Sequence, residues 1–474
     1  MDNKTKIALF SVGLSTYWAQ FPGLLARLNG YRETILNRIS CNKDVAVVDA
    51  GMVDTVEKAR SAGELFRKED VSLIFLHVST YALSSVVLPA VLNARVPVII
   101  LNLQPVPAID YVAFNQMGDR GKMTGEWLAH CQACSVPEIA SVFNRSGIRY
   151  EFVSGYLQEK FSWDEITGWI EAARVADVMR TNNLGILGHY YNGMLDVYTD
   201  LTQQSSAFGT HIELLEMCEL KNYRDEITEA KVKEKTEEFQ TEFEVSPECG
   251  LEELERAART SLALDKLVRV HGLGSLAYYY EGTSGNEYEK IVTSMIAGNT
   301  LLTGRHVPVA GECEVKNAQA MKIMDAFGVG GSFSEFYAMD FNDDIVLLGH
   351  DGPAHFNIAE GRVKLVPLPV YHGKPGRGLS IQMTVKNGPV TLLSLVEGKD
   401  GLFLLVAEGE SVPGPVLEIG NTNSRYRFSI GAREFINRWS KQGPAHHCAI
   451  GIGNIAGRIA KLGMLLGLPV VRIC

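Results

Sequence analysis

Two glutamates and three histidines of this sequence have the types and spacing of metal ligands. Glu312, Glu335 and His350 follow one another at separations of 23 and 15 residues, and each lies beside an expected turn or strand end. The adjacent His446 and His447 precede an apolar run, where two imidazoles are costly to bury unless one has a ligand. Carboxylates and imidazoles without a thiolate favour an octahedral divalent ion such as Mn²⁺ over a structural zinc. Such a site polarises neighbouring oxygens of a polyol while a carboxylate moves a proton between adjacent carbons.

Glu312 stands between an expected strand and an expected helix. The apolar residues 307–310 precede it, and a helical pattern of apolar residues follows it as far as Gly328. A carboxylate at this junction faces solvent or a cleft, although the helix macrodipole alone also favours a glutamate there. Glu314 competes with Glu312 on these local grounds.

Residues 1–176 are expected to form a doubly wound α/β domain. Short apolar runs rich in valine and isoleucine predict buried parallel strands, and helical spacing fills two of the gaps between them. His77 follows the third strand, at the sheet edge where ligands bind in such folds. No Gly-x-Gly-x-x-Gly follows the first strand, which argues against a dinucleotide site. The expected strands are 6–12, 45–48, 71–76 and 96–101, and the expected helices are 55–68 and 81–93.

Two further domains are expected to follow. Residues 177–330 again mix strand and helix patterns, which is typical of a central α/β domain. In residues 331–474, alternating apolar and polar positions and turn signals at Asn387-Gly388 and Asp400-Gly401 predict a mostly antiparallel β domain, as a sheet or a barrel. Pro367 and Pro369 limit their stretch to an edge strand or a connection. In the central domain the expected strand is 276–280, and the expected helices are 223–240, 251–270 and 287–303.

Composition and charge exclude several classes of protein. A chain of 474 residues exceeds one hydrophobic core, and 46% hydrophobic with 21% charged residues is ordinary globular usage. The net charge of −10, without a Lys/Arg-rich run, argues against nucleic-acid binding. There is neither a signal-peptide pattern nor an apolar stretch of about 18 residues, so we expect a cytoplasmic protein with no membrane partner.

The eight cysteines are scattered along the chain, and this distribution predicts reduced thiols. One Cys-x-x-Cys occurs, at Cys131 and Cys134, within an expected helix. A single pair in a helical setting is weak evidence for zinc or redox chemistry.

The residues around the candidate ligands resemble the L-arabinose isomerase family, within the wider arabinose/fucose isomerase fold. Residues 309–318 read Val-Ala-Gly-Glu-Cys-Glu-Val-Lys-Asn-Ala, similar to a family pattern of aromatic-Ala-Gly-Glu-Gly-Asp-Trp-Lys-Thr-Ala. Gly-Gly-Ser-Phe-Ser-Glu at 330–335, Asp-Ile-Val-Leu-Leu-Gly-His at 344–350 and Pro-Ala-His-His at 444–447 follow in the family's order and spacing. The likeness covers about 140 residues, with weaker similarity reaching the start of the chain.

The resemblance implies an activity and a set of roles. Glu312, Glu335, His350 and His447 would bind Mn²⁺ or another divalent cation, and the two glutamates would also be the acid/base pair. The family interconverts an aldose and a ketose through an enediol, moving a proton between C1 and C2. Its members are homo-oligomers, here expected as a trimer or hexamer, in which a neighbouring subunit closes the active site. Residues expected to contact the sugar are Gln116, His130 and His446.

The sequence departs from the family at positions that would surround the sugar. Cys313 replaces a glycine, Val315 replaces a tryptophan, and residues 336–340 replace an Asp-Tyr-Thr-Tyr-His run. Arg305 and His306 add basic groups where the family is mainly neutral. A larger or an anionic aldose is therefore an alternative to L-arabinose, although surface basicity also explains Arg305.

Two other functions stay open on the sequence. One is a non-catalytic sugar-binding or regulatory protein on the same fold, because doubly wound domains host many functions. The presence of all four ligand-type residues weighs against it. The other is a metal hydrolase with an activated water. Chelation would abolish either enzymatic activity, so the products must distinguish them.

Overall fold

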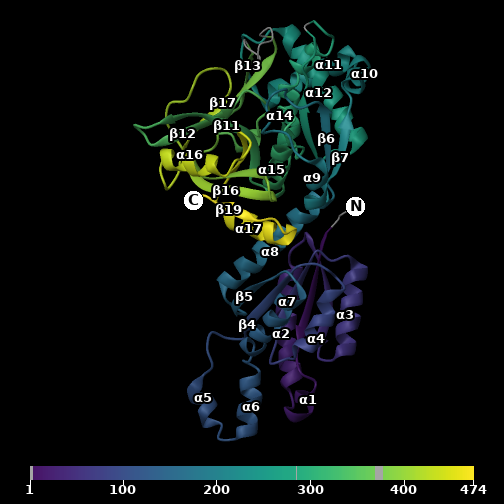
Figure 1. Cartoon of the computed structure of the whole chain (residues 1–474), viewed down its shortest axis with the longest axis vertical. Helices are drawn as coiled ribbons and strands as arrows, with labels where there is room; N and C mark the ends of the chain where they lie inside the picture. The colour runs from purple at the N-terminus through teal and green to yellow at the C-terminus, as the bar shows by residue number, and fades with distance from the viewer. Residues whose placement is uncertain (1–3, 284, 369–376) are drawn as a thin grey trace. The chain divides into compact units, whose positions relative to one another are not determined.

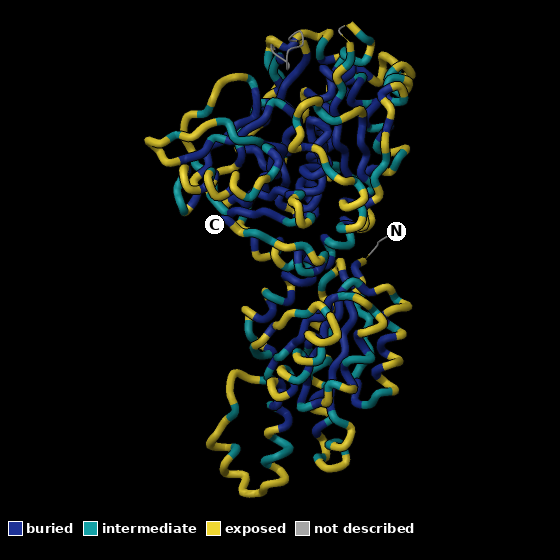
Figure 2. Tube along the Cα trace, viewed as in Figure 1, coloured by how far each residue is buried: buried dark blue, intermediate teal, exposed yellow. Residues whose placement is uncertain are grey.

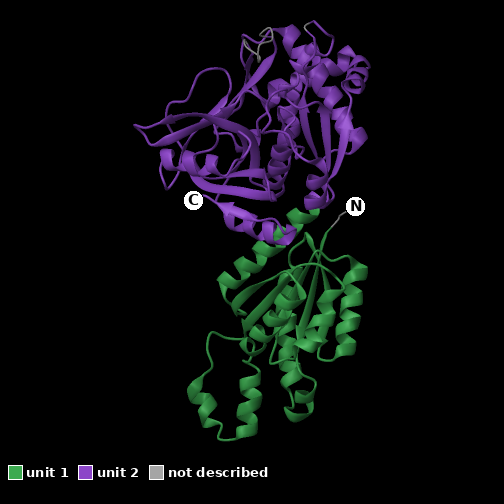
Figure 3. Ribbon diagram, in the orientation of Figure 1, with its two compact units in different colours: residues 1–177 green, residues 178–474 purple. Residues whose placement is uncertain are grey.

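The computed structural model describes residues 4–283, 285–368 and 377–474. The chain forms two compact units, Met1–Asp177 and Val178–Cys474, and their boundary falls within helix α8 (Lys160–Arg180) (Figure 3). The first expected boundary, after residue 176, and the second, after residue 330, both stay predictions. Among the described residues, no helix combines the length and the apolar composition required to cross a membrane.

Unit 1 is built on a parallel five-stranded sheet in the order β2-β1-β3-β4-β5 (Figure 1). This confirms the doubly wound parallel fold predicted for the N-terminal part. The fifth strand escaped prediction because it lies at the sheet edge and only its central Val153 is buried. The strands are β1 (Thr5–Val12), β2 (Val45–Val53), β3 (Leu73–Val78), β4 (Val98–Gln104) and β5 (Tyr150–Tyr156).

The core of unit 1 lies between this sheet and its helices. In helix α3, Ala59, Ala62 and Phe66 are buried at helical spacing, and Thr55 caps the first turn by accepting from the amide of Lys58. Gly63 allows α3 to approach α4 closely, because a Cβ there would lie 2.6 Å from the carbonyl oxygen of Pro89. The helices before α8 are α1 (Thr16–Gln20), α2 (Leu24–Ser40), α3 (Val56–Glu69), α4 (Ser84–Leu92), α5 (Tyr111–Gln116), α6 (Arg120–Leu128) and α7 (Val136–Ser146).

His77 lies within strand β3 and not in a loop beyond it. Its ring is fully buried, and Nδ1 lies 2.8 Å from the hydroxyl of Ser11, whereas Nε2 has no hydrogen-bond partner among the described residues. Burial, with a smaller contribution from Arg32, lowers the pKa of His77 to about 3. His77 is therefore a neutral residue of the core, and the position expected for it, beyond the end of the third strand, is wrong.

We expect His77 to make the stability of unit 1 depend on pH. Its pKa is lower in the folded chain than in the unfolded chain, so between about pH 6.5 and 3 the unfolded chain binds a proton that the folded chain does not. The unfolding free energy contributed by this residue falls by about 2 kcal/mol from pH 7 to 5. Urea unfolding at both pH values checks this: His77→Asn should lose less stability on acidification than the wild type. The exposed His211→Asn should behave as wild type, and equal losses in all three proteins would refute the prediction.

Cys131 and Cys134 form a disulfide, so the expectation of reduced thiols is wrong for this pair. The expected helix ends at Leu128, and the two cysteines lie in the turn and the short 3₁₀ segment η1 (Ala133–Ser135) before α7. A three-residue separation in such a turn brings two sulfur atoms within bonding distance. The six other cysteines are free.

Unit 2 contains a parallel four-stranded sheet in the order β10-β9-β6-β7. Two expected helices are each divided, one at residues 226–228 and one at 293–295, where Ile227 and Met295 turn inward to the core. The strands are β6 (Asn183–Gly188), β7 (His211–Leu215), β9 (Ser275–Tyr279) and β10 (Val309–Ala310). The helices are α9 (Leu201–Phe208), α10 (Met217–Asp225), α11 (Glu229–Glu242), α12 (Leu251–His271), α13 (Glu289–Val292), α14 (Ile296–Gly304) and α15 (Val315–Ala326).

A closed antiparallel barrel forms the other part of unit 2. The strands follow the order β15-β18-β11-β12-β17-β16, and β15 also pairs with β16, which closes the ring; β19 extends it in parallel to β16. The predicted mostly antiparallel C-terminal region is thus confirmed, and its strands are largely buried (Figure 2). The elements are β11 (Gly330–Asp340), β12 (Ile345–His350), β15 (Gly388–Gly398), β16 (Gly401–Val412), β17 (Thr422–Arg427), β18 (His447–Ile452), β19 (Val470–Arg472), α16 (Ala432–Lys441) and α17 (Ala456–Leu466).

One of the two predicted hairpins is present. The Asp400-Gly401 turn joins β15 to β16, with Gly398 opposite Gly401. The Asn387-Gly388 hairpin is wrong, because β14 (Leu379–Gln382) pairs with β13 (Lys364–Pro367) in a separate sheet. In that sheet β13 lies between β14 and β8 (Glu244–Val245), so it is not an edge strand; Pro367 is tolerated as its last residue. Pro369 lies outside the described residues.

Candidate metal centre

Three adjacent barrel strands bring candidate ligands together. Glu335 of β11 is opposite His447, the first residue of β18, and on its other side opposite Gly349, which precedes His350 at the end of β12. Antiparallel pairing places residues opposite each other about 5 Å apart, so the register makes Glu335 and His447 neighbours, and His350 lies one residue beyond the partner of Glu335 on the next strand.

Glu312 reaches the same place from the short connection between β10 and α15. Both Glu312 and Cys313 have left-handed backbone angles, with φ of 54° and 60°, an unusual conformation for residues with a side chain. The amide of Cys313 donates to the carbonyl of Tyr278 at 3.0 Å, which helps to hold the turn. The glycine that the resembling family has at position 313 suits this backbone. The following helix α15 is buried on every side, so its burial extends beyond the apolar residues from which the helix was predicted.

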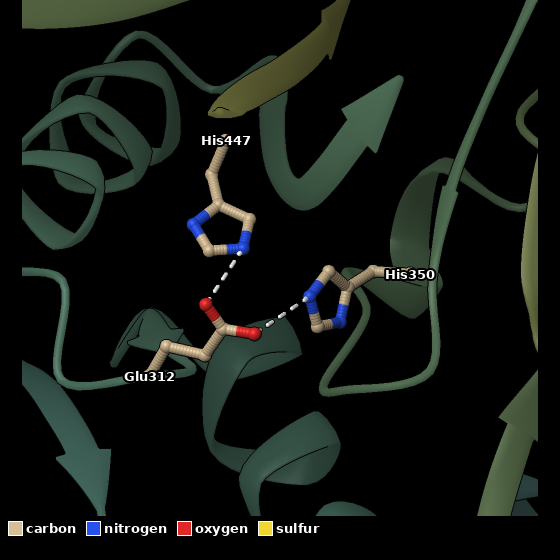
Figure 4. Close-up of side chains that lie close together, drawn as sticks. All are labelled: Glu312, His350 and His447. Carbon is tan, nitrogen blue, oxygen red and sulfur yellow. Dashed lines mark ion pairs between the residues drawn. The ribbon is translucent and has the colours of Figure 1, made fainter. Parts of the chain in front are cut away.

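Glu312, His350 and His447 face one another in the interior (Figure 4). Oε1 of Glu312 lies 4.0 Å from Nε2 of His350, and Oε2 lies 3.5 Å from Nε2 of His447. All three residues are at most 7% exposed. Among the described residues, Nε2 of His447 has no hydrogen-bond partner. A buried nitrogen that faces a carboxylate and has no such partner is expected to have a ligand.

Glu335 and His446 form a second group with His447, nearer to solvent. Nε2 of His446 lies 3.2 Å from Oε2 of Glu312 and 4.0 Å from Oε2 of Glu335. His446 therefore links the two carboxylates that were predicted as the acid/base pair.

Glu314 contacts His447 on the side of the ring away from Glu312. Its Oε2 lies 2.6 Å from Nδ1 of His447, and both side chains are almost fully buried. When Glu314 is ionised it accepts the Nδ1 proton, which leaves the Nε2 lone pair of His447 directed at Glu312. His350 is also held at Nδ1, but as an acceptor: the amide of Gly352 donates to it at 2.9 Å, which puts the proton of the neutral ring on Nε2. The two glutamates thus have different surroundings. Glu312 lies among the imidazoles, and Glu314 contacts His447.

The charges of these buried groups depend on their neighbours. Burial would raise the pKa of Glu312, but His446, His447 and His350 outweigh it and lower that pKa. Burial raises the pKa of Glu335, and it raises that of Glu314 to about 8.

The pKa values of the three histidines are shifted in different directions. Burial lowers the pKa of His350 to about 4 and that of His447 to about 3, so both rings are neutral, as metal ligation requires. Burial also acts to lower the pKa of His446, but Glu312 and Asp196 outweigh it and raise the pKa to about 9.

The donor set fits a divalent cation. Neutral imidazoles and carboxylates supply mixed nitrogen and oxygen ligands of the kind that Mn²⁺ and similar ions accept. Burial disfavours the ionised forms of Glu314 and Glu335, and a nearby cation would favour them. The cation would also contact Oε2 of Glu312 and bind Nε2 of His447, which has no hydrogen-bond partner among the described residues.

Asp196 and Lys316 are site residues that the sequence did not reveal. Oδ2 of Asp196 lies 2.6 Å from Nδ1 of His446 and accepts from the backbone amide of the same residue at 3.0 Å. Nζ of Lys316 donates to the carbonyl oxygen of Asp196 at 2.5 Å. An aspartate in a polar aromatic loop carries no local signal for this role, because the contact spans 250 residues of sequence.

The other predicted contact residues lie in unit 1. Gln116 is exposed at the end of α5, and His130 packs beside Glu126 at 3.2 Å, which in turn pairs with Arg27. Glu126 and Arg27 also line a cavity of about 530 Å³. Glu312 belongs to unit 2, and the roles of Gln116 and His130 as sugar contacts stay predictions.

The basic pair before the motif is engaged in other contacts. Arg305 pairs with Glu238 and Glu242 of α11, and His306 lies 2.9 Å from Asp325. These contacts support surface basicity as the explanation of Arg305.

Comparisons with known proteins indicate a remote relationship. No protein-family model matches the chain. A curated sulfoquinovose isomerase from Alkalicoccus urumqiensis is 20% identical over 330 residues, which cover 68% of this chain and 72% of that protein.

Among solved structures, an ABC transporter periplasmic solute binding protein from Actinobacillus succinogenes 130z with bound D-allose is 16% identical. The match covers 65% of this chain and 78% of that chain, with a TM-score of 0.16, a value too low to show a shared fold. The similarity to the curated protein supports a relationship to sugar isomerases of the arabinose/fucose isomerase kind, without singling out one member.

Proposed function

We propose that this protein is a divalent-metal-dependent aldose–ketose isomerase. The metal ligands would be Glu312, Glu335, His350 and His447, with Mn²⁺ as the expected ion. The observation that carries the proposal is the buried Nε2 of His447, which has no hydrogen-bond partner among the described residues and faces Glu312, with the other two ligands beside them. The name of the curated relative, an isomerase of a sugar, supports the same class of reaction.

The two glutamates have the environments of a base and an acid. The imidazoles around Glu312 keep it ionised, whereas burial favours the protonated form of Glu335. Glu312 would remove the proton from C2 of the open-chain aldose while Glu335 protonates the C1 oxygen, which gives an enediol. Glu312 would then return its proton to C1, and Glu335 would take the proton of the C2 hydroxyl. A divalent ion, when bound, would polarise the two adjacent oxygens and lower the cost of the enediol.

We infer that His446 binds the sugar beside this pair. It is held by Asp196 on one ring nitrogen and faces Glu312 with the other. A cationic imidazole there would donate a hydrogen bond to a sugar oxygen as negative charge develops. Asp196 acts through His446 and is a positioning residue.

Removing the Asp196 carboxylate should reduce turnover without releasing the metal. We expect Asp196→Ala to lower kcat by about 10-fold to 100-fold, as is typical when the support of a functional histidine is lost. Asp196→Asn keeps one acceptor for Nδ1 and should retain more activity than Asp196→Ala. Steady-state kinetics with metal analysis checks this, and Leu195→Ala, at a neighbouring residue that is 76% exposed, should be neutral. Equal kcat in Asp196→Ala and wild type would refute the role of Asp196.

A panel of sugars tests the proposed reaction. Protein stripped with a chelator and resupplied with Mn²⁺ should convert at least one aldose to its ketose. The panel contains L-arabinose, other pentoses, hexoses, deoxysugars, acidic sugars and sulfoquinovose, and products are identified by chromatography and NMR. Incorporation of deuterium from D₂O at C1 or C2 would show the proton transfer.

The alternative outcomes are distinct. A sugar that binds without turnover would indicate a sugar-binding or regulatory protein. A hydrolysed product would indicate a metal hydrolase. No ketose from any aldose, with metal bound, would refute the isomerase proposal.

A further inference from the structure

We propose that Cys131 and Cys134 form a reversible thiol–disulfide exchange site, at which Cys134 reacts with small thiols and disulfides. The observation behind it is the asymmetric placement of the two sulfurs. Cys131 is 2% exposed and packs against Leu24, Leu28 and Leu128, whereas Cys134 is exposed. An incoming thiolate can therefore reach only the Cys134 side of the bond.

The position of Cys134 favours its thiolate. It lies in η1, directly before the 11-residue helix α7. The positive end of the helix macrodipole stabilises a negative charge at such a position, which lowers the pKa of a cysteine thiol, makes it a better leaving group and raises its thiolate fraction. The apolar surroundings of Cys131 have the opposite effect on its thiol.

The turn between the cysteines is held independently of the disulfide. The side-chain amide of Gln132 donates to the carbonyls of Ser79 and Ala129, each at 2.9 Å, and the hydroxyl of Ser135 accepts from the amide of Ala82 at 2.7 Å. These bonds do not involve sulfur, so the two thiols are expected to stay close after reduction. Re-formation of the disulfide is then an intramolecular step.

The thiol–disulfide exchange proceeds in two steps. The thiolate of a small thiol such as glutathione attacks Sγ of Cys134, the bond between the protein sulfurs breaks, and Cys131 leaves as a thiolate that takes a proton from water. A second glutathione thiolate attacks the mixed disulfide, which releases Cys134 and gives oxidised glutathione. Two electrons pass from the two glutathiones to the protein disulfide, and the reverse sequence restores it. In a reducing compartment, disulfides of this kind are usually transient.

The exchange site is next to His130, one of the residues expected to contact the sugar. His130 directly precedes Cys131, and its ring contacts Glu126 and lies 3.4 Å from a guanidinium nitrogen of Arg27. Opening the disulfide removes one of the constraints on the connection between α6 and α7 that carries this histidine. The redox state is therefore expected to change the mobility of this connection.

Mapping the disulfide and measuring thiol reactivity tests the proposal. Peptide mapping of protein equilibrated with oxidised glutathione should find an intramolecular disulfide between Cys131 and Cys134, distinct from any mixed disulfide at the exposed Cys41 and Cys218. In Cys131→Ala, Cys134 should form a mixed disulfide with oxidised glutathione about 10-fold faster than the exposed Cys41 and Cys218 of the same molecule, because more of it is thiolate. In Cys134→Ala, the buried Cys131 should react more slowly than both.

Hydrogen exchange gives a readout that does not depend on these variants. Amides of residues 126–136 should exchange faster after reduction of the wild-type protein, and re-oxidation should restore them. The proposal is overturned if the pair stays reduced across all glutathione ratios, if it resists reduction by glutathione, or if Cys134 is no more reactive than Cys41 and Cys218. Loss of isomerase activity is not a readout here, so failure of one proposal does not affect the other.

Discussion

Glu312→Gln should abolish isomerase activity, with a fall in kcat of about 10⁴-fold or more. The amide cannot accept a proton from carbon, and loss of a positioned base alone accounts for about 10²-fold to 10⁴-fold. It is also a poorer ligand for a divalent ion, so a second loss adds to the first. Glutamine has the shape of glutamate, and the hydrogen bonds of the Glu312 backbone are unaffected by the exchange. Steady-state kinetics on the best sugar of the panel, with circular dichroism to confirm the fold, measures this effect.

A matched exchange separates the effect from a general loss of charge. Glu234→Gln changes an exposed carboxylate on α11 and should leave kcat and KM as in the wild type. A Glu312→Gln protein that keeps more than about one-hundredth of the wild-type kcat would exclude Glu312 as the general base.

Removal of divalent metal should abolish turnover and also lower thermal stability. The proposed ligands come from β11, β12, β18 and the β10–α15 connection, so a bound ion joins four segments of unit 2. An ion that binds only the folded chain stabilises it by about 2.7 kcal/mol at 100 times its dissociation constant. Adding Mn²⁺ to stripped protein should therefore raise the melting temperature of the wild type, but not that of Glu312→Gln. Calorimetry with and without Mn²⁺, alongside activity, tests both effects.

A substitution of Glu314 should weaken metal binding without abolishing it. Glu314→Gln keeps a hydrogen-bond acceptor for Nδ1 of His447 but removes the carboxylate behind it, and we expect metal affinity to fall about 10-fold to 100-fold. Excess Mn²⁺ should restore most of its activity, whereas it should not rescue Glu312→Gln. Full turnover by wild-type protein shown by elemental analysis to be free of metal would contradict the metal-dependent mechanism.

The backbone at Glu312 and Cys313 gives physical meaning to one departure from the resembling family. Both residues have positive φ, where a Cβ is unfavourable and glycine is not. The exchange of the family's glycine for Cys313 therefore carries a conformational cost. The Cys313 side chain at this position is fully buried.

The sequence alone was sufficient for the general architecture. Continuous apolar runs predicted the parallel strands of unit 1, and the Asp400-Gly401 turn predicted the hairpin of β15 and β16, because these features depend on neighbours along the chain. Residue chemistry also selected Glu312, Glu335, His350 and the histidine pair as candidate ligands. It did so by type and by resemblance, without showing that they meet.

Only the tertiary structure showed where the members of that set lie. Barrel register placed His447 opposite Glu335 and inside the group, and left His446 half exposed beside Asp196. The contact of His447 with Glu314 spans 133 residues and that of His446 with Asp196 spans 250, distances over which no local pattern carries information. Whether Cys131 and Cys134 form a disulfide likewise depended on where α6 ends, which helical spacing did not predict. Local propensity determines which elements form, whereas strand pairing and packing determine which side chains meet.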